Sequence, residues 1–156
     1  MKITFSRNGG RARVICRRTD GTFTSGDLGP SLPAHDLAHF IVEQALQLPA
    51  GFFVSIAKGY SIQELSDATT VRSLGAEPYV AEILARALGS LAMGACTADE
   101  FPELVGTEFQ QTGLRVPEGV SAESATRMLE ALQLLLTRFA ELAPGELMEL
   151  QFCESP

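Results

Sequence analysis

Apolar and polar residues alternate along the first 25 positions of the chain, a pattern that predicts β-strands. Ile3 and Phe5 share one face of the first alternating stretch. Residues 8–10 read Asn-Gly-Gly, which favours a tight hairpin turn because Asn and Gly accept positive φ angles. An Asp-Gly pair at residues 20–21 indicates a second turn, and residues 26–33 indicate a loop. The expected meander has strands at residues 2–7, 11–17 and 22–25.

From residue 34 onward the apolar positions recur every three or four residues, the period of an amphipathic α-helix. Pro49 and Gly51 end the first helical stretch, and Pro78 suits the first turn of a later one. Ser61 and Ser121 stand where N-cap residues are expected. Residues 66–77 follow no clear pattern. The expected helices cover residues 34–48 and 52–57, a short one from 61, a long one from 78 to about 95, one ending near 111, and one from 122 to 143.

Alternation returns at the end of the chain, where Met148, Leu150 and Phe152 share one face. A final strand after a helical block most simply pairs with the N-terminal meander. The predicted fold is therefore α+β: a small antiparallel sheet, made of the N-terminal three-strand meander plus the C-terminal strand, packed against a helical block. At 156 residues the chain has the usual size of one domain, so residues 1–156 are expected to form a single domain.

Charge is unevenly distributed along the chain, whose net charge is −7. Six of the 12 basic residues precede Asp20, so the remainder carries 6 basic and 19 acidic residues, or −13. An arginine-rich hairpin suggests nucleic-acid binding, but the acidic remainder would repel phosphates. We expect instead that the outward Glu149 faces Arg13 or Arg17 across strands and forms ion pairs there. Nucleic-acid binding is therefore the weakest functional hypothesis.

The cysteines and the apolar runs indicate a soluble, cytoplasmic protein. The chain has three cysteines, an odd number without a C-x-x-C pair, which is typical of a reducing compartment. The N-terminal residues lack the apolar stretch of a signal peptide. The longest uncharged run, residues 44–57, has 14 residues, fewer than the roughly 20 that a membrane-spanning helix needs. We therefore expect no membrane association.

One polar cluster in the first predicted helix has residues suited to chemistry: His35, Asp36, His39 and Glu43. Residues four apart lie on the same face of a helix, so His35 and His39 can direct two imidazoles at one ion, with Glu43 one turn further on. The candidate metal ligands are therefore His35, His39 and Glu43, and the metal would be zinc or another divalent transition metal. Asp36 is the candidate catalytic base.

The same segment resembles the H-E-x-x-H motif of the zincins, here in the form H-D-x-x-H. In that family two histidines bind Zn²⁺ and the acid between them activates a water molecule. The longer run P-x-H-D-L-x-H-F-x-V-E, followed by G-F-F and A-x-G, is similar to the signature of a family of bacterial proteins of unknown function. The N-terminal hairpin and the Pro-Gly pair before the final strand also look similar, so the resemblance extends over most of the chain. It implies a shared fold and a bacterial origin, without implying an activity.

Three functions are consistent with these observations. In the first, the cluster is structural, with His39 and Glu43 as an ordinary i, i+4 pair, and the protein acts through a protein partner or through self-association, as a homodimer or another homo-oligomer. In the second, the chain is a metal-binding protein or a metal-dependent hydrolase that uses His35, His39 and Glu43. Nucleic-acid binding is the third. No G-x-S-x-G or G-x-G-x-x-G motif occurs, which disfavours an α/β-hydrolase and a dinucleotide-binding fold.

Overall fold

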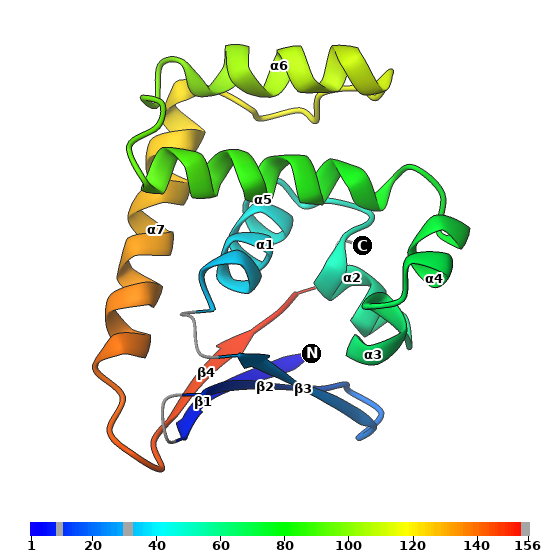
Figure 1. The fold of residues 1–156 in the computed structure, drawn as a ribbon, viewed down its shortest axis with the longest axis vertical. Helices are drawn as coiled ribbons and strands as arrows, with labels where there is room; N and C mark the ends of the chain where they lie inside the picture. The colour runs from blue at the N-terminus through cyan, green and yellow to red at the C-terminus, as the bar shows by residue number, and fades with distance from the viewer. Residues whose placement is uncertain (9–10, 30–32, 154–156) are drawn as a thin grey trace.

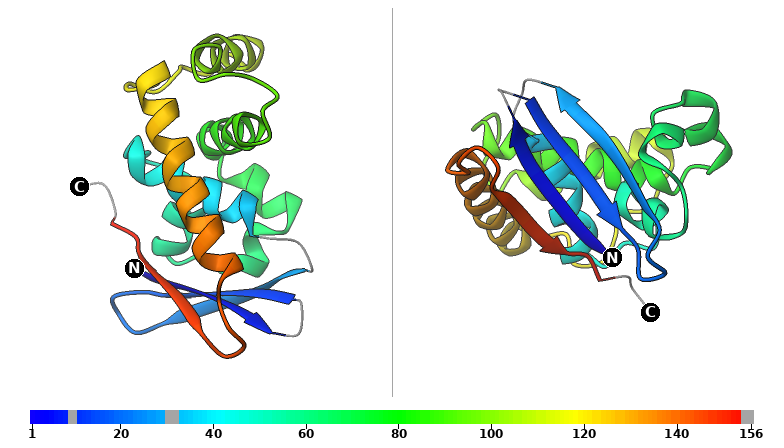
Figure 2. Two further views of the ribbon diagram at one scale, coloured as in Figure 1. Left: turned by 90° about the vertical axis from the view of Figure 1, so that its left-hand side faces the viewer. Right: turned by 90° about the horizontal axis from the view of Figure 1, so that it is seen from below.

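The structure is a computed structural model that describes residues 1–8, 11–29 and 33–153. A four-stranded antiparallel sheet, in the order β3-β2-β1-β4, forms one side of the molecule. The helices lie together on one side of this sheet (Figures 1 and 2). The strands are β1 (Lys2–Asn8), β2 (Arg11–Arg17), β3 (Phe23–Gly29) and β4 (Leu147–Gln151). The helices are α1 (Ala34–Ala45), α2 (Phe52–Ala57), α3 (Ile62–Leu65), α4 (Ala68–Ser73), α5 (Pro78–Ala92), α6 (Phe101–Thr112) and α7 (Ala122–Ala140).

The alternating segments form strands because every second side chain can enter the apolar core. Ile3 and Phe5 of β1 lie opposite Cys16 and Val14 of β2, and Phe5 also lies opposite Met148 of β4. All five side chains are at most 1% exposed. The C-terminal strand therefore completes the sheet begun by the N-terminal meander, and the α+β prediction is confirmed.

Strand β3 is longer than the sequence indicated. It continues to Gly29, so the loop expected at residues 26–33 was wrong for its first part. Gly26 pairs with Val14, and a Cβ atom on Gly26 would come within 2.8 Å of Ile62 Cγ2. This glycine therefore permits close packing of α3 on the strand and does not mark a turn. The turn expected at residues 8–10 falls largely outside the described residues.

The expected ion pairs between Glu149 and the arginines of β2 are absent from the described residues, and that prediction was wrong. Strand β4 pairs with β1, which separates β4 from β2. Glu149 instead forms an ion pair with Lys2, with 2.5 Å between Oε1 and Nζ. Arg13 donates a hydrogen bond to a serine hydroxyl of β3, and Arg17 lies over a phenylalanine ring of the same strand.

Most helices lie where periodicity placed them, and their ends differ by a few residues. Helix α1 stops at Ala45, three residues before its expected end, and Gln47 then adopts a positive φ of 47°. Ser61 and Ser121 are N-cap residues as expected, and each forms a capping box with the residue three positions on. In the stretch without a clear pattern, the carboxylate of Asp67 accepts a hydrogen bond from the Thr70 N–H and caps α4.

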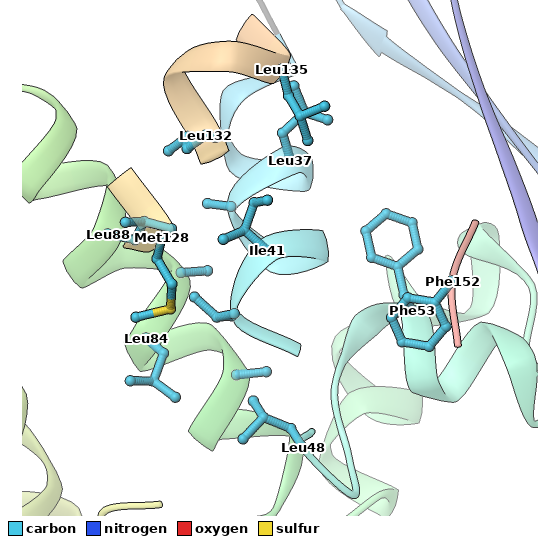
Figure 3. Packing of buried hydrophobic residues seen from close by; sticks show 14 of the residues in the cluster. Leu37, Ile41, Leu48, Phe53, Leu84, Leu88, Met128, Leu132, Leu135 and Phe152 are labelled. Carbon is cyan, nitrogen blue, oxygen red and sulfur yellow. The ribbon is translucent and has the colours of Figure 1, made fainter. Parts of the chain in front are cut away.

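Helix α1 lies at the centre of the helical block, between the sheet and α5 (Figure 1). Its apolar side carries Leu37 and Ile41, which are buried in the same cluster as Leu84 of α5 and Leu132 of α7 (Figure 3). Because this side of α1 packs in the core, its histidine-bearing side faces the first half of α5 and the N-terminus of α2. No helix in the described part of the chain is both long and apolar enough to cross a bilayer.

Candidate functional site

The two histidines of α1 meet a carboxylate of α5. His39 Nε2 lies 3.1 Å from Glu82 Oε2, and His35 Nε2 lies 3.4 Å from Glu82 Oε1. One ligand atom from each of these three residues can be chosen so that all three atoms lie within 4.8 Å of one another. The two imidazole rings are edge to face, with centroids 4.8 Å apart. His35, His39 and Glu82 are therefore the candidate metal centre of the described residues, and they are called the His-His-Glu cluster below.

Glu43, the third ligand expected from the sequence, has a different position and different partners. It is 1% exposed, and its two oxygens accept hydrogen bonds from the backbone N–H groups of Phe52, at 2.8 Å, and Val54, at 3.0 Å. Its Oε1 also lies 3.1 Å from His39 Nδ1. The carboxylate of Glu43 thus holds the first turn of α2 and the Nδ1 atom of His39. Glu82 is the acid that contacts both histidines.

Gly51 is required by this arrangement. A Cβ atom at residue 51 would come within 2.4 Å of Glu43 Cδ and within 2.7 Å of both carboxylate oxygens. The glycine therefore lets the backbone of α2 approach the buried acid closely enough to be held by it. The glycine that precedes α2 is therefore a local structural requirement.

His39 is held between two carboxylates, and this controls its protonation. Burial of the ring lowers the pKa of His39, but hydrogen bonds to Glu43 and Glu82, together with their negative charges, outweigh burial and raise the pKa to about 9. Hydrogen bonds from His35 and His39 in turn hold the pKa of Glu82 far below its usual value. At neutral pH and without a metal, His39 is therefore an imidazolium that donates from both nitrogens.

Asp36 lies beside the same cluster. Its carboxyl group is half-buried, and burial raises its pKa, while the neighbouring His35 and His39 partly counter this effect. Asp36 also lines the cavity described next, so the structure places the predicted catalytic base next to the candidate ligands.

A cavity of about 350 Å³ opens beside the His-His-Glu cluster. That volume lies within the range of small-molecule sites. Its lining combines polar side chains, from the cluster, Asp36 and Ser55, with apolar side chains from α2, α3, the α4 segment and the start of α5. The lining residues are His35, Asp36, His39, Gly51, Phe52, Ser55, Leu65, Val71, Leu74, Pro78, Tyr79 and Glu82.

Sequence reasoning found His35, His39 and Asp36 but missed Glu82. Glu82 is 43 residues from His39, and no spacing rule connects a residue of α5 with α1 before their packing is known. One weak signal was present, because Glu82 is the lone acid within the apolar helix Pro78–Ala92. A half-buried acid in such a helix needs solvent or a partner, and here it pairs with the two histidines and with Arg86 of the same helix, whose Nε lies 3.8 Å from Glu82 Oε1.

Comparisons with models of protein families, with curated proteins and with solved structures found no match. The similarity to the bacterial family and to the zincin motif therefore stays a prediction.

Proposed function

We propose that the protein binds a divalent transition metal, with Zn²⁺ the first candidate, through His35, His39 and Glu82. The observation that carries this proposal is the convergence of two imidazoles and one carboxylate from two helices, with ligand atoms within 4.8 Å of one another. Two histidines and a glutamate are a donor set of known catalytic zinc sites, which leave a further coordination position for water or substrate.

The partner of the inner nitrogen of His39 supports this assignment. Glu43 Oε1 lies 3.1 Å from His39 Nδ1 and is itself fixed by two backbone N–H groups. When Nδ1–H donates to this carboxylate, the lone pair of Nε2 points toward Glu82 and is available to a metal. A metal ion would thus replace the proton that otherwise lies between His39 and Glu82. Histidine ligands in metal sites are commonly oriented by a carboxylate in this way.

The activity that this arrangement supports is metal-dependent hydrolysis. A bound Zn²⁺ lowers the pKa of its water and polarises a carbonyl group. The water oxygen would add to the carbonyl carbon, the bond to the leaving group would break, and the proton of the water would pass to that group. Asp36 lines the cavity next to both histidines, where its carboxylate can accept a hydrogen bond from the water. Association with a protein partner or a second copy, a bacterial origin and a cytoplasmic location stay predictions.

The proposal is tested by metal analysis of untagged protein, stripped with chelator, incubated with one of several divalent metals and desalted. We expect about one equivalent of zinc in the wild type and loss of most of it in His35→Ala and Glu82→Gln. His35 is 55% exposed and Glu82 is 39% exposed at the side chain, so both variants should keep their fold, which far-UV circular dichroism checks. Glu77→Gln, at the exposed N-cap of α5, is the matched control and should keep its zinc. Absence of metal in the wild type after incubation with excess Zn²⁺ would retire the proposal and leave His39 as a structural residue.

A further inference from the structure

Part of the lining of the cavity beside the His-His-Glu cluster is formed by apolar side chains that are not part of the hydrophobic core. Helices α3 and α4 contain no buried residue, yet Leu65, Val71 and Leu74 of this segment line the cavity. All three side chains are half-buried, and only Leu65 packs against the hydrophobic core. Val71 and Leu74 therefore face the cavity without contributing to the core.

Other lining residues of the cavity are also apolar. Phe52 lies next to His39, with ring centroids 5.9 Å apart, and Pro78 and Tyr79 bring the start of α5 to the cavity. The cavity thus combines several apolar lining residues with the acids and histidines of the cluster and Asp36. A molecule that fills it would need an apolar body and a polar head directed at the cluster.

The charges around the His-His-Glu cluster further restrict the chemistry of the ligand's polar head group. A divalent metal carries two positive charges, and Glu82 and Asp36 together offset them when the histidines are neutral. Arg86, whose Nε lies 3.8 Å from Glu82 Oε1, also forms an ion pair with Glu108, which offsets its charge. The carboxylate of Glu43 is hydrogen-bonded instead to the backbone N–H groups of α2 and to His39 Nδ1. A carboxylate head would face the charge of Asp36, whereas an uncharged carbonyl group can bind the metal through oxygen. An N–H on the same head would suit Asp36 as a hydrogen-bond acceptor.

We propose that the cavity binds a small uncharged amphiphile, whose amide-type head (a carbonyl oxygen beside an N–H) meets the metal and Asp36 and whose alkyl or aryl body contacts Val71, Leu74 and Phe52. This inference rests on the proposed metal site. At about 30 Å³ for each water-sized group, a volume of about 350 Å³ accommodates roughly a dozen non-hydrogen atoms. The ligand is therefore a compact molecule and not a polymer segment.

The test uses straight-chain hydroxamic acids with two to eight carbons, which carry a carbonyl oxygen, an N–H and a metal-binding hydroxyl. Their affinity for zinc-loaded protein is measured by calorimetry. We expect a rise of about two- to fourfold for each added methylene until the cavity is full, since each buried methylene contributes up to roughly fourfold. Affinity that does not change with chain length, in protein shown to hold zinc, would overturn the ligand class and leave the metal site intact.

Two substitutions in α4 test where the apolar part of the ligand binds. Val71→Trp should fill the cavity and reduce the ratio of eight-carbon to two-carbon affinity by at least about tenfold, and Val71→Phe is the milder alternative should the larger side chain prevent folding. Thr69→Trp, at an exposed position of α4 outside the cavity lining, should leave the ratio unchanged. An unchanged ratio in a folded Val71 variant would place the alkyl chain elsewhere.

The effect of charge on the head group is tested by comparing an uncharged primary amide with a carboxylate of equal chain length. The wild type should prefer the amide, and Asp36→Asn should reduce the ratio of amide affinity to carboxylate affinity several-fold, because the substitution removes the charge that opposes the carboxylate. A preference unaffected by this substitution would refute the role given to Asp36. Zinc titration of the same samples separates the two proposals: wild-type protein that takes up no zinc overturns the metal site itself, whatever the ligands do.

Discussion

Replacing Glu43 by glutamine should strongly destabilise the metal-free protein, although the two side chains have nearly the same shape. The glutamate is 1% exposed and accepts hydrogen bonds from the N–H groups of Phe52 and Val54 and from His39. A glutamine supplies one oxygen and an NH₂ group, so one of these donors would face another donor. A buried donor without an acceptor costs about 1–3 kcal/mol. Breaking a buried charge pair by removing one partner costs about 3–5 kcal/mol, which includes such losses.

We therefore expect Glu43→Gln to lower the free energy of unfolding by about 3–5 kcal/mol, which corresponds to a fall in Tm of roughly 10 °C for a chain of this size. The assay is urea unfolding at pH 7 in the presence of chelator, followed by circular dichroism. Glu149→Gln removes an exposed carboxylate and should change the free energy by less than about 1 kcal/mol. A Glu43 variant within about 0.5 kcal/mol of the wild type would refute the structural role assigned to this residue.

Three further predictions concern the same region. In metal-free protein the pKa of His39 is about 9 in the folded state, above the unfolded value of 6.5. Protonated His39 therefore stabilises the fold fully below pH 6.5, and this contribution is lost as the pH rises through 9. The loss, on the order of 3 kcal/mol, should appear in urea unfolding between pH 6 and 9.5 and be absent in His39→Gln. Gly51→Ala should cost about 1–3 kcal/mol because its Cβ would overlap the Glu43 carboxylate, and thermal unfolding at equal pH measures this. Arg18→Ala should cost about 1.5–3 kcal/mol, because the guanidinium donates 2.6 Å hydrogen bonds to the carbonyl oxygens of Ile56 and Tyr60, and Arg18→Lys should recover only part of that loss.

The fold was predictable where one local signal determined one element. Alternation placed β1 and β2, and capping residues placed α3 and α7, because burial of one face and satisfaction of free N–H groups are local requirements. The end of β3 was not predictable, since Gly26 serves the packing of Ile62 and its sequence context resembles a loop. The pairing of Glu149 depended on strand order, which no local pattern fixes.

The candidate site was likewise predictable from the sequence only where a local signal was present. The spacing of His35 and His39 placed both rings on one face of α1, and the structure brings them together. Glu43 follows the same spacing, but α2 supplies N–H groups that use its carboxylate, and only tertiary packing shows this. Glu82 required knowledge of how α1 packs against α5. A short motif can thus identify the helix that carries a site, whereas the remaining ligand comes from the packing of distant segments.

The most direct test of the central claim is a crystal structure of the protein with zinc, in which anomalous scattering locates the metal. The account predicts a single strong peak bonded to nitrogen atoms of His35 and His39 and to a carboxylate oxygen of Glu82, each at about 2.0–2.2 Å. Glu43 should remain on the backbone of α2. A peak coordinated by Glu43 instead of Glu82, a peak only at other residues such as Cys153, or no peak at saturating zinc would contradict the account.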